Sequence, residues 1–274
     1  MSGGWLALRR ATPARIALGR SGAALPTAAQ LDFQLAHARA RDAVHAALDP
    51  EPILAALTEL GLQAVRLRSA AADRATYLRR PDLGRKLNAA CRQLLLRHSG
   101  EGRNPASRGP SGESLGPGLR RDDERINIAF VVADGLSATA VNAHAVPLIK
   151  AVLPKLHDCE IAPVTVVEGG RVAIGDEVGG LLEADLVAVL IGERPGLSAA
   201  DSLGVYVTWA PAPGAVDAAR NCLSNIRPEG MPIAAAADAL VALIANARRH
   251  RMTGVALSQR SAQEALRALQ PPGK

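Results

Sequence analysis

The sequence predicts an α/β fold, in which a Rossmann-like domain with a mostly parallel sheet is preceded by a helical N-terminal region. Two observations carry this prediction. From residue 125 onward, apolar strand-like runs alternate with stretches of helical spacing, which is typical of right-handed βαβ units. Before residue 98, alanine-rich stretches of helical spacing dominate. The 274 residues are 48% hydrophobic and 21% charged, so the chain can bury a sizeable core.

Residues 1–98 are expected to be mostly helical, and prolines and capping residues indicate where the helices begin. Thr27 is expected as the N-cap of the first helix, and the run Asp49-Pro50-Glu51-Pro52 as a break before the second. Gly61 would end that second helix. The predicted helices are 27–47, 53–60 and 81–98, the last beginning at Pro81.

Residues 99–124 differ sharply in composition from the rest of the chain. They are rich in Gly, Pro, Ser and Arg and have no apolar periodicity. Such a segment cannot bury enough surface to offset the entropy lost on ordering, so we expect a mobile surface insertion away from any ligand. A basic docking arm is the alternative.

Residues 125–274 form the predicted Rossmann-like domain, and each of its elements follows from apolar periodicity. The turn over 133–137 should connect the first strand to the first helix. Pro147 is expected to interrupt that helix. The predicted strands are 126–132, 162–167, 185–191 and 204–209, and the predicted helices are 138–156, 175–183, 233–248 and 258–269.

The strand predicted over 185–191 ends in a charged turn framed by glycines. Ligands of such folds bind outside the carboxyl ends of the strands. Gly192 and Gly196 allow the backbone to approach a ligand closely, and Pro195 stiffens the turn. Glu193 is therefore a candidate ligand contact. The alternative is that Glu193 and Arg194 form only a surface ion pair at an ordinary strand end.

Composition and motifs argue against several classes of protein. Aromatic residues make up only 2% of the chain, which disfavours stacking platforms for single-stranded nucleic acid. The net charge of +6 permits a polyanionic partner, but no nucleic-acid-binding module is recognisable, and docking on another protein explains the charge equally well. Cys91, Cys159 and Cys222 lack zinc-site spacing, and their use indicates a reducing compartment. We find no secretion signal and predict no membrane span.

No catalytic arrangement emerges from the residues themselves. The chain has neither GxGxxG nor a P-loop, and no Ser-His-Asp or paired-carboxylate pattern. Cys222 could be a nucleophile, but with no histidine near it in the sequence a buried core thiol is the simpler interpretation. The residues alone therefore indicate a ligand-binding α/β domain without catalytic machinery of its own.

Four stretches closely resemble the small (light) chain of ethanolamine ammonia-lyase. They are LTELGLQAVRLRSAAADRATYLRRPDLGRKL, VVADGLSATAVNAH, LIGERPGLSAADSLGVYVTWAP and RNCLSNIRPEG. GERPGLS followed by D-x-x-R-N-C-x-S-N-I is specific to that family. The resemblance runs from about Thr12 to the C-terminal helix, and 99–124 is its main interruption.

The resemblance implies an adenosylcobalamin-dependent conversion of ethanolamine into acetaldehyde and ammonia. A large chain, a TIM barrel, would bind the substrate and conduct the radical rearrangement. The small chain would cover the corrin from below with its Rossmann-like domain, and residues 1–98 would contact the large chain. Six large and six small chains are the expected assembly.

Three cofactor contacts carry over from the family to this sequence. Val172 is expected to supply an apolar or backbone contact, Glu193 a hydrogen-bond-accepting carboxylate, and Cys222 part of the lining of the tail pocket. No residue of this chain is expected to be catalytic or to bind a metal. Cobalamin proteins that replace the lower ligand by histidine carry D-x-H-x-x-G, which this chain lacks, so a base-on cofactor is expected.

The expected location is the bacterial cytoplasm. Relatives that enter ethanolamine microcompartments often begin with a short amphipathic helix and a linker, whereas this sequence starts almost directly at RRATPARIALGRSGAALPT. A free enzyme is therefore preferred over an encapsulated one. Two other classes stay open: a stand-alone Rossmann-like nucleotide-binding protein, and a basic scaffold that stabilises a partner.

Overall fold

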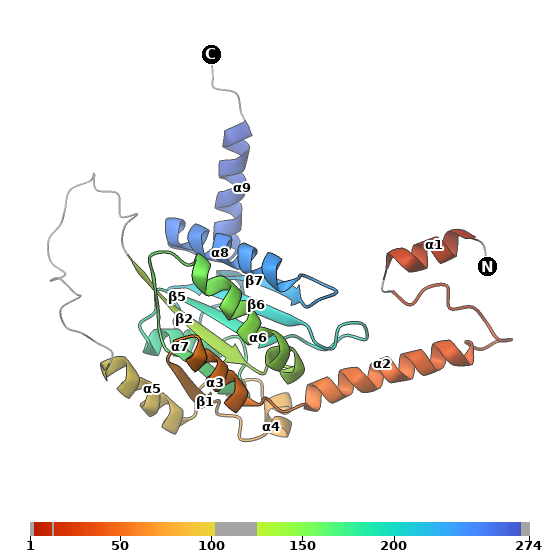
Figure 1. Ribbon diagram of the computed structural model, residues 1–274, viewed down its shortest axis with the longest axis horizontal. Helices are drawn as coiled ribbons and strands as arrows, with labels where there is room; N and C mark the ends of the chain where they lie inside the picture. Colours follow the sequence, from red (N-terminus) through yellow and green to blue (C-terminus); the bar gives the residue numbers. More distant parts are fainter. Residues whose placement is uncertain (1–2, 13, 102–124, 270–274) are drawn as a thin grey trace, which may run out of the picture.

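The computed structural model of the chain describes residues 3–12, 14–101 and 125–269. In this part, a seven-stranded sheet lies at the centre with helices on both faces (Figure 1). The strands are β1 Ala64–Arg68, β2 Ile126–Ala133, β3 Cys159–Ile161, β4 Val164–Glu168, β5 Leu186–Gly192, β6 Leu203–Trp209 and β7 Arg220–Ile226. Their order is β1-β4-β2-β5-β6-β7, and β3 pairs with the first residues of β2.

The sheet has a parallel half and an antiparallel half. β1, β4, β2 and β5 run parallel to one another, which confirms the predicted mostly parallel α/β fold. β6 is antiparallel to β5, and β7 is antiparallel to β6. The carboxyl ends of the parallel strands therefore meet at one edge, where Rossmann-like folds place their ligands.

Helices cover both faces of the central strands. One face packs against α3 (Pro50–Glu59), α6 (Ala138–Val152) and α8 (Ile233–His250), and the other against α5 (Ala89–Glu101) and α7 (Ile174–Leu181). Successive residues of β2 alternate between the two cores, so that Phe130 faces the first and Val131 the second, each fully buried. Burial on both faces explains why β2 and β5 are almost continuously apolar.

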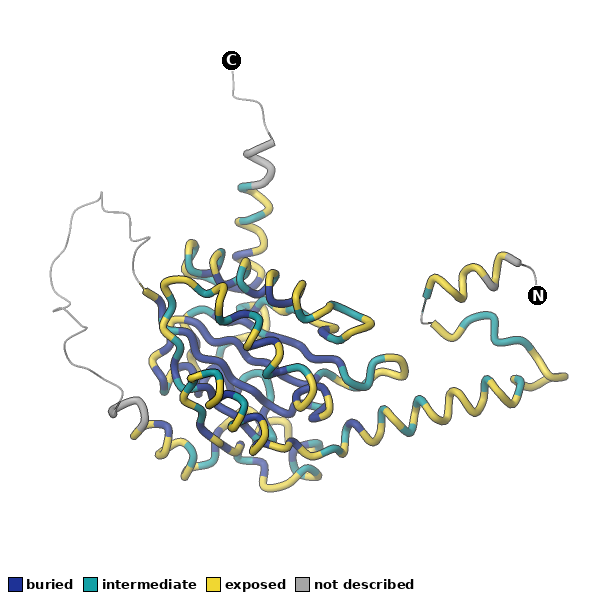
Figure 2. The backbone as a smooth tube through the Cα atoms, in the orientation of Figure 1, coloured by how far each residue is buried: buried dark blue, intermediate teal, exposed yellow. Residues whose placement is uncertain are grey.

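The N-terminal helices lie apart from this body. α2 (Thr27–His45) extends away from the sheet and α1 (Gly3–Ala11) lies near its far end, while α9 (Val255–Leu269) leads away in another direction (Figure 1). Figure 2 shows α2 exposed along most of its length. The short helix α4 (Arg74–Arg79) lies next to the end of α2, because the Arg74 Nε–H donates to the carbonyl of Val44 over 2.7 Å.

The N-terminal region also contains a strand that the sequence did not predict. β1 joins the sheet beside β4, with Val65 and Leu67 buried. Arg66 and Arg68 point the other way, and the Arg66 Nε lies 2.8 Å from an oxygen of Glu168. A five-residue strand with two arginines does not show an apolar run, and pairing with β4 brings it into the sheet.

Several predicted helix starts were wrong. The N-cap of α2 is Pro26, and Thr27 is already its first helical residue. α3 begins at Pro50 rather than after the proline pair, because a proline in the first turn sacrifices no helical hydrogen bond. Pro81 starts no long helix: a single 3₁₀ turn, Leu83–Arg85, comes first, and α5 follows at Ala89.

The C-terminal region matches the predicted elements more closely. α6 begins after Ser137, whose hydroxyl accepts a hydrogen bond from the Ala140 N–H, and it runs through Pro147 without interruption. The short strand β3 and the strand β7 were not predicted. Of the proposed insertion, residues up to Glu101 belong to α5, and 102–124 lie outside the described residues.

A partly buried ion pair joins the N-terminal region to the end of β2. The Arg74 Nη1 lies 3.1 Å from Oδ2 of Asp134 and donates to the Gly135 carbonyl over 2.8 Å. The Gly170 N–H donates to the other Asp134 oxygen over 3.0 Å. Burial raises the pKa of Asp134 from 3.8 to about 6, although the charge of Arg74 acts in the opposite direction.

This raised pKa gives a testable dependence of stability on pH. The folded chain holds the Asp134 proton to higher pH than the unfolded chain, so the contribution of Asp134 to the free energy of unfolding is fully present below about pH 4. It is lost as the pH rises to about 6. Between these limits, the free energy of unfolding of the wild type should fall by about 3 kcal/mol relative to that of Asp134→Asn. Urea unfolding at several pH values measures both. A pH-independent difference would contradict this, and Glu160→Gln, at an exposed carboxylate, serves as the control.

Candidate functional site

Gly192, the last residue of β5, lies very close to the backbone of the turn after β2. The Leu136 N–H donates to the Gly192 carbonyl over 2.9 Å. A Cβ atom on Gly192 would lie 2.0 Å from the Ser137 carbonyl oxygen, so only glycine fits there. The next residue is Glu193, which this contact places at the carboxyl edge of the sheet, as the sequence predicted.

The Glu193 carboxylate is held over the antiparallel half of the sheet. Its Oε2 accepts hydrogen bonds from the Ser202 hydroxyl, 2.5 Å away, and from the Asn225 N–H, 3.1 Å away. A Cβ atom on Gly204 would lie 3.0 Å from Oε1, so the glycine leaves room for the carboxylate. Among the described residues no ion pair joins Glu193 to Arg194, which removes the surface-pair alternative.

Cys222 lies beside Glu193, with Tyr206 forming the connection. Tyr206 on β6 pairs in register with Cys222 on β7, so both side chains stand on the same face. Burial, followed by the interactions with Cys222 and Glu193, raises the pKa of Tyr206 to about 12. Partial desolvation of the thiol by its neighbours, with the charge of Glu193, also raises the pKa of Cys222, although a hydrogen bond with Tyr206 acts in the opposite direction. Both groups are therefore neutral at pH 7.

The interpretation of Cys222 as a buried core thiol was wrong, because the residue is exposed. It lies on β7, whose residues alternate between the covered face and the open face of the sheet. The C-terminal β7 borders no further strand in the described part of the chain. Cys222 can therefore contact a ligand or a partner.

Val172 packs on the same side of the sheet as Tyr206. It lies in the turn between β4 and α7 and is partly buried. Both Val172 and Tyr206 pack against the core cluster on the face that α5 and α7 cover. α7 lies over β5 and β2, while Tyr206 is only partly covered and Cys222 is exposed. We call this half-open surface, defined by Val172, Glu193, Tyr206 and Cys222, the β5–β7 face.

Arg227, directly after β7, holds the loop that follows Glu193 in place. Arg227 donates from Nη1 to the Ser198 carbonyl over 2.6 Å and lies 3.4 Å from Asp201. The same guanidinium pairs with Glu229 at 2.6 Å, and His144 lies 3.8 Å from Asp201. The loop carrying GERPGLS is therefore fixed at both of its ends.

Sequence reasoning missed Ser202, Tyr206, Asn225 and Arg227. Tyr206 carried a usable signal, since it interrupts the otherwise apolar alternation of β6. Ser202 contacts Glu193 through the antiparallel pairing of β5 with β6, whereas Asn225 and Arg227 contact Glu193 or its loop through the pairing of β6 with β7, which the sequence did not predict. Their roles follow from tertiary structure alone.

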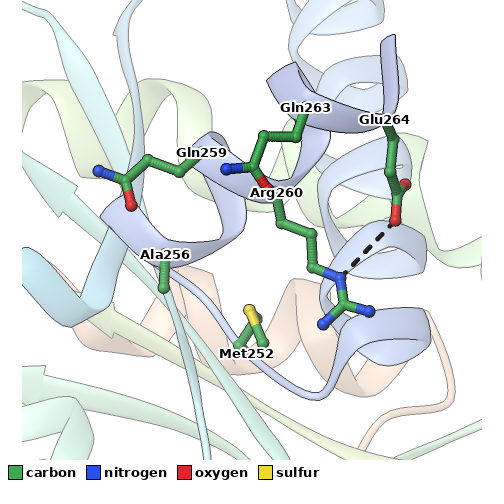
Figure 3. A pocket seen from close by; sticks show the side chains of 6 residues that line it. All are labelled: Met252, Ala256, Gln259, Arg260, Gln263 and Glu264. Carbon is green, nitrogen blue, oxygen red and sulfur yellow. Dashed lines mark ion pairs between the residues drawn. The ribbon is translucent and has the colours of Figure 1, made fainter. Parts of the chain in front are cut away.

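The described residues also contain hollows outside this face, among them one of about 170 Å³ at the carboxyl ends of β2 and β4, lined by Arg74, Asp134 and Glu168, and one of about 720 Å³ beside α8, lined by His157, Val241 and Ile244. The described residues contain no group of three or more His, Cys, Asp or Glu side chains placed to hold a metal ion. Within 3–12, 14–101 and 125–269, no helix is long and apolar enough to cross a membrane. A hollow of about 440 Å³ on α9 lies between Met252, Arg260 and Glu264, and its lining includes none of the predicted contacts (Figure 3).

The β5–β7 face can hold a ligand that is partly apolar and partly rich in hydrogen-bond donors. Glu193 supplies a fixed acceptor, while Tyr206, Cys222 and Val172 supply neutral surface. The fold and this face define the class: a Rossmann-like α/β protein whose candidate ligand surface spans the junction of the parallel and antiparallel halves of its sheet.

Comparison with known proteins identifies the family. The family model described as "Ethanolamine ammonia-lyase light chain (EutC)" matches residues 2–258. Proteins named ethanolamine ammonia-lyase small subunit are similar along nearly their whole length. The one from Azotobacter vinelandii is 51% identical over 255 residues, 92% of this chain and 87% of the relative. The one from Ralstonia nicotianae is 52% identical over 257 residues, 93% and 88% of the two chains.

A third relative extends the match. The ethanolamine ammonia-lyase small subunit of Pseudomonas aeruginosa strain UCBPP-PA14 is 47% identical over 269 residues, which covers 97% of this chain and 91% of the relative. The chain belongs to the ethanolamine ammonia-lyase light chain family.

Proposed function

We propose that this chain binds adenosylcobalamin against the large subunit of an ethanolamine ammonia-lyase, and that the complex converts ethanolamine into acetaldehyde and ammonia. One observation carries the proposal: in a member of this family, Glu193 and Cys222 come together on an open sheet face, joined through Tyr206. When bound, the cofactor supplies radical chemistry through homolysis of its cobalt–carbon bond.

The β5–β7 face fits a corrin in its chemistry. A corrin is a flat, largely apolar macrocycle with amide side chains around its rim, and those amides are hydrogen-bond donors. Ser202 and Asn225 occupy one oxygen of Glu193, and the other oxygen accepts no hydrogen bond from the described residues. This oxygen can accept from a rim amide or a hydroxyl group. The neutral Tyr206 and Cys222 add no charge beneath the ring.

The exposure of the face supports a second protein as its cover. Radical chemistry requires the exclusion of water, and a ligand on an exposed strand such as β7 would stay wet without a partner. We propose that the large subunit, a TIM barrel, closes this side and that six large and six small chains assemble. The cofactor is proposed to bind base-on, since the chain has no D-x-H-x-x-G motif.

The N-terminal region is proposed to contact the large subunit. α2 lies apart from the core (Figure 1), yet several of its large apolar side chains are exposed. Leu31, Phe33 and Leu35 are 58%, 42% and 51% exposed. Leu31 and Leu35, four residues apart, share one face of α2. Exposed apolar side chains on one face of a protruding helix are typical of a protein interface.

The purified chain alone should not form acetaldehyde from ethanolamine, because the proposed function assigns the substrate site to the large subunit. Mixing the two purified subunits should give turnover that requires adenosylcobalamin, measured by coupling acetaldehyde to an alcohol dehydrogenase. Turnover by the isolated chain, or turnover of the mixture without added cofactor, would contradict the proposal.

Glu193→Gln should weaken cofactor binding by the complex. The substitution keeps the shape of the side chain but removes its charge, and a charge-assisted hydrogen bond contributes about 1.5–3 kcal/mol. The dissociation constant for adenosylcobalamin should therefore rise about 10- to 150-fold, while turnover at saturating cofactor should change less.

The matched control for this experiment is Arg194→Gln, at the exposed neighbour in the same turn. Its dissociation constant should equal that of the wild type. An unchanged constant in Glu193→Gln would mean that this strand end is an ordinary turn.

A further inference from the structure

A buried bidentate ion pair joins α7 to β7. The Arg220 Nη1 lies 2.5 Å from Oδ1 of Asp176, and its Nη2 lies 2.7 Å from Oδ2. The two side chains are only 3% and 1% exposed. Arg220 also donates to the Thr208 hydroxyl over 3.1 Å and to the Ala215 carbonyl over 2.9 Å. One guanidinium thus ties together α7, β6, β7 and the loop between the two strands.

The pair lies next to the two chain segments that carry Val172 and Cys222, two of the proposed cofactor contacts. Asp176 lies in the first turn of α7, just after the turn that carries Val172. Arg220 begins β7, and Cys222 is the next residue on the same face of that strand. Since Asp176 and Arg220 are 44 residues apart in the chain, their contact fixes in space two segments that the sequence leaves far apart.

A buried ion pair of this kind is poorly explained by stability alone. Removing two charges from water costs several kcal/mol, and replacing such a pair by apolar residues of similar size is often neutral or stabilising. A fork of two parallel hydrogen bonds, in contrast, restricts both distance and orientation far more than apolar packing does. The pair therefore contributes geometry that apolar packing at these positions would not reproduce.

We propose that Asp176 and Arg220 are positioning residues, which hold Val172 and Cys222 at the separation and orientation that the cofactor requires. Neither residue contacts the cofactor in this proposal. It rests on the proposed function, because the geometry matters only if the β5–β7 face binds adenosylcobalamin. The proposal predicts that replacing this pair weakens cofactor affinity without lowering folding stability.

The test compares three variants of the full chain in complex with the large subunit. Asp176→Leu with Arg220→Met removes both charges and keeps apolar volume. Arg220→Lys keeps the charge but cannot form the fork. Lys155→Met with Asp238→Leu removes an exposed ion pair away from the β5–β7 face and is the matched control. Thermal unfolding measures stability, and titration of the complex with adenosylcobalamin, followed by its visible absorbance, measures affinity.

The double variant at the pair should unfold within a few degrees of the wild type or above it, while its cofactor dissociation constant rises about 10- to 100-fold, as for other residues that orient a ligand-binding shell. Arg220→Lys should also lose affinity, by about tenfold. The control variant should bind as the wild type does.

Wild-type affinity in the folded double variant would overturn the proposal. If that variant does not fold, Arg220→Lys decides: a folded complex with unchanged affinity overturns the proposal, and weakened affinity supports it. A wild-type complex that binds no adenosylcobalamin would instead refute the proposed function, and the two failures are therefore distinguishable.

Discussion

The close crossing of β5 over the turn after β2 is the constraint that places the whole candidate site. Gly135, which has a φ of 56°, would bring a Cβ atom within 2.3 Å of the Gly192 carbonyl, and Gly192 would bring one within 2.0 Å of the Ser137 carbonyl. Any larger residue at either position would separate the two strand ends. With both glycines, the end of β5 packs directly against the turn after β2, and this contact fixes the position of Glu193 at the edge of the sheet.

From that point the chain changes from parallel to antiparallel pairing, and this change creates the β5–β7 face. Parallel strands need crossover helices, which cover their faces, whereas the connection between β6 and β7 contains only the 3₁₀ turn Asp217–Ala219 and no α-helix. α7 covers β5 but leaves Tyr206 half-buried and Cys222 exposed. Two sets of contacts then fix the borders of this open surface. One is the hydrogen bond from Arg227 to the loop after Glu193, and the other is the bidentate ion pair between Asp176 and Arg220. A rigid and uncovered surface is suited to a ligand shared with a second subunit.

The sequence predicted the parts of the fold that depend on local pattern. Long apolar runs identified β2 and β5, and the rule that ligands bind at carboxyl strand ends pointed to Glu193. β1, β3 and β7 were missed because they are short or carry polar residues, and only pairing with a neighbour stabilises them. Val172 and Cys222 came from resemblance to the family, since no local pattern marks either residue. Tyr206 stands out within the apolar pattern of β6, but its proximity to Cys222 follows only from the pairing of β6 with β7.

The central claim is that adenosylcobalamin covers the β5–β7 face in the assembled enzyme, and the accessibility of Cys222 tests it most directly. The complex would be treated with iodoacetamide with and without saturating cofactor, and the rate of modification of each cysteine followed by peptide mass spectrometry. Cys159 is the internal control, because it pairs with the first residue of β2, at the opposite end of the sheet. The account predicts that the cofactor slows Cys222 modification about tenfold or more and leaves Cys159 unchanged. Equal rates at Cys222 with and without cofactor would contradict it.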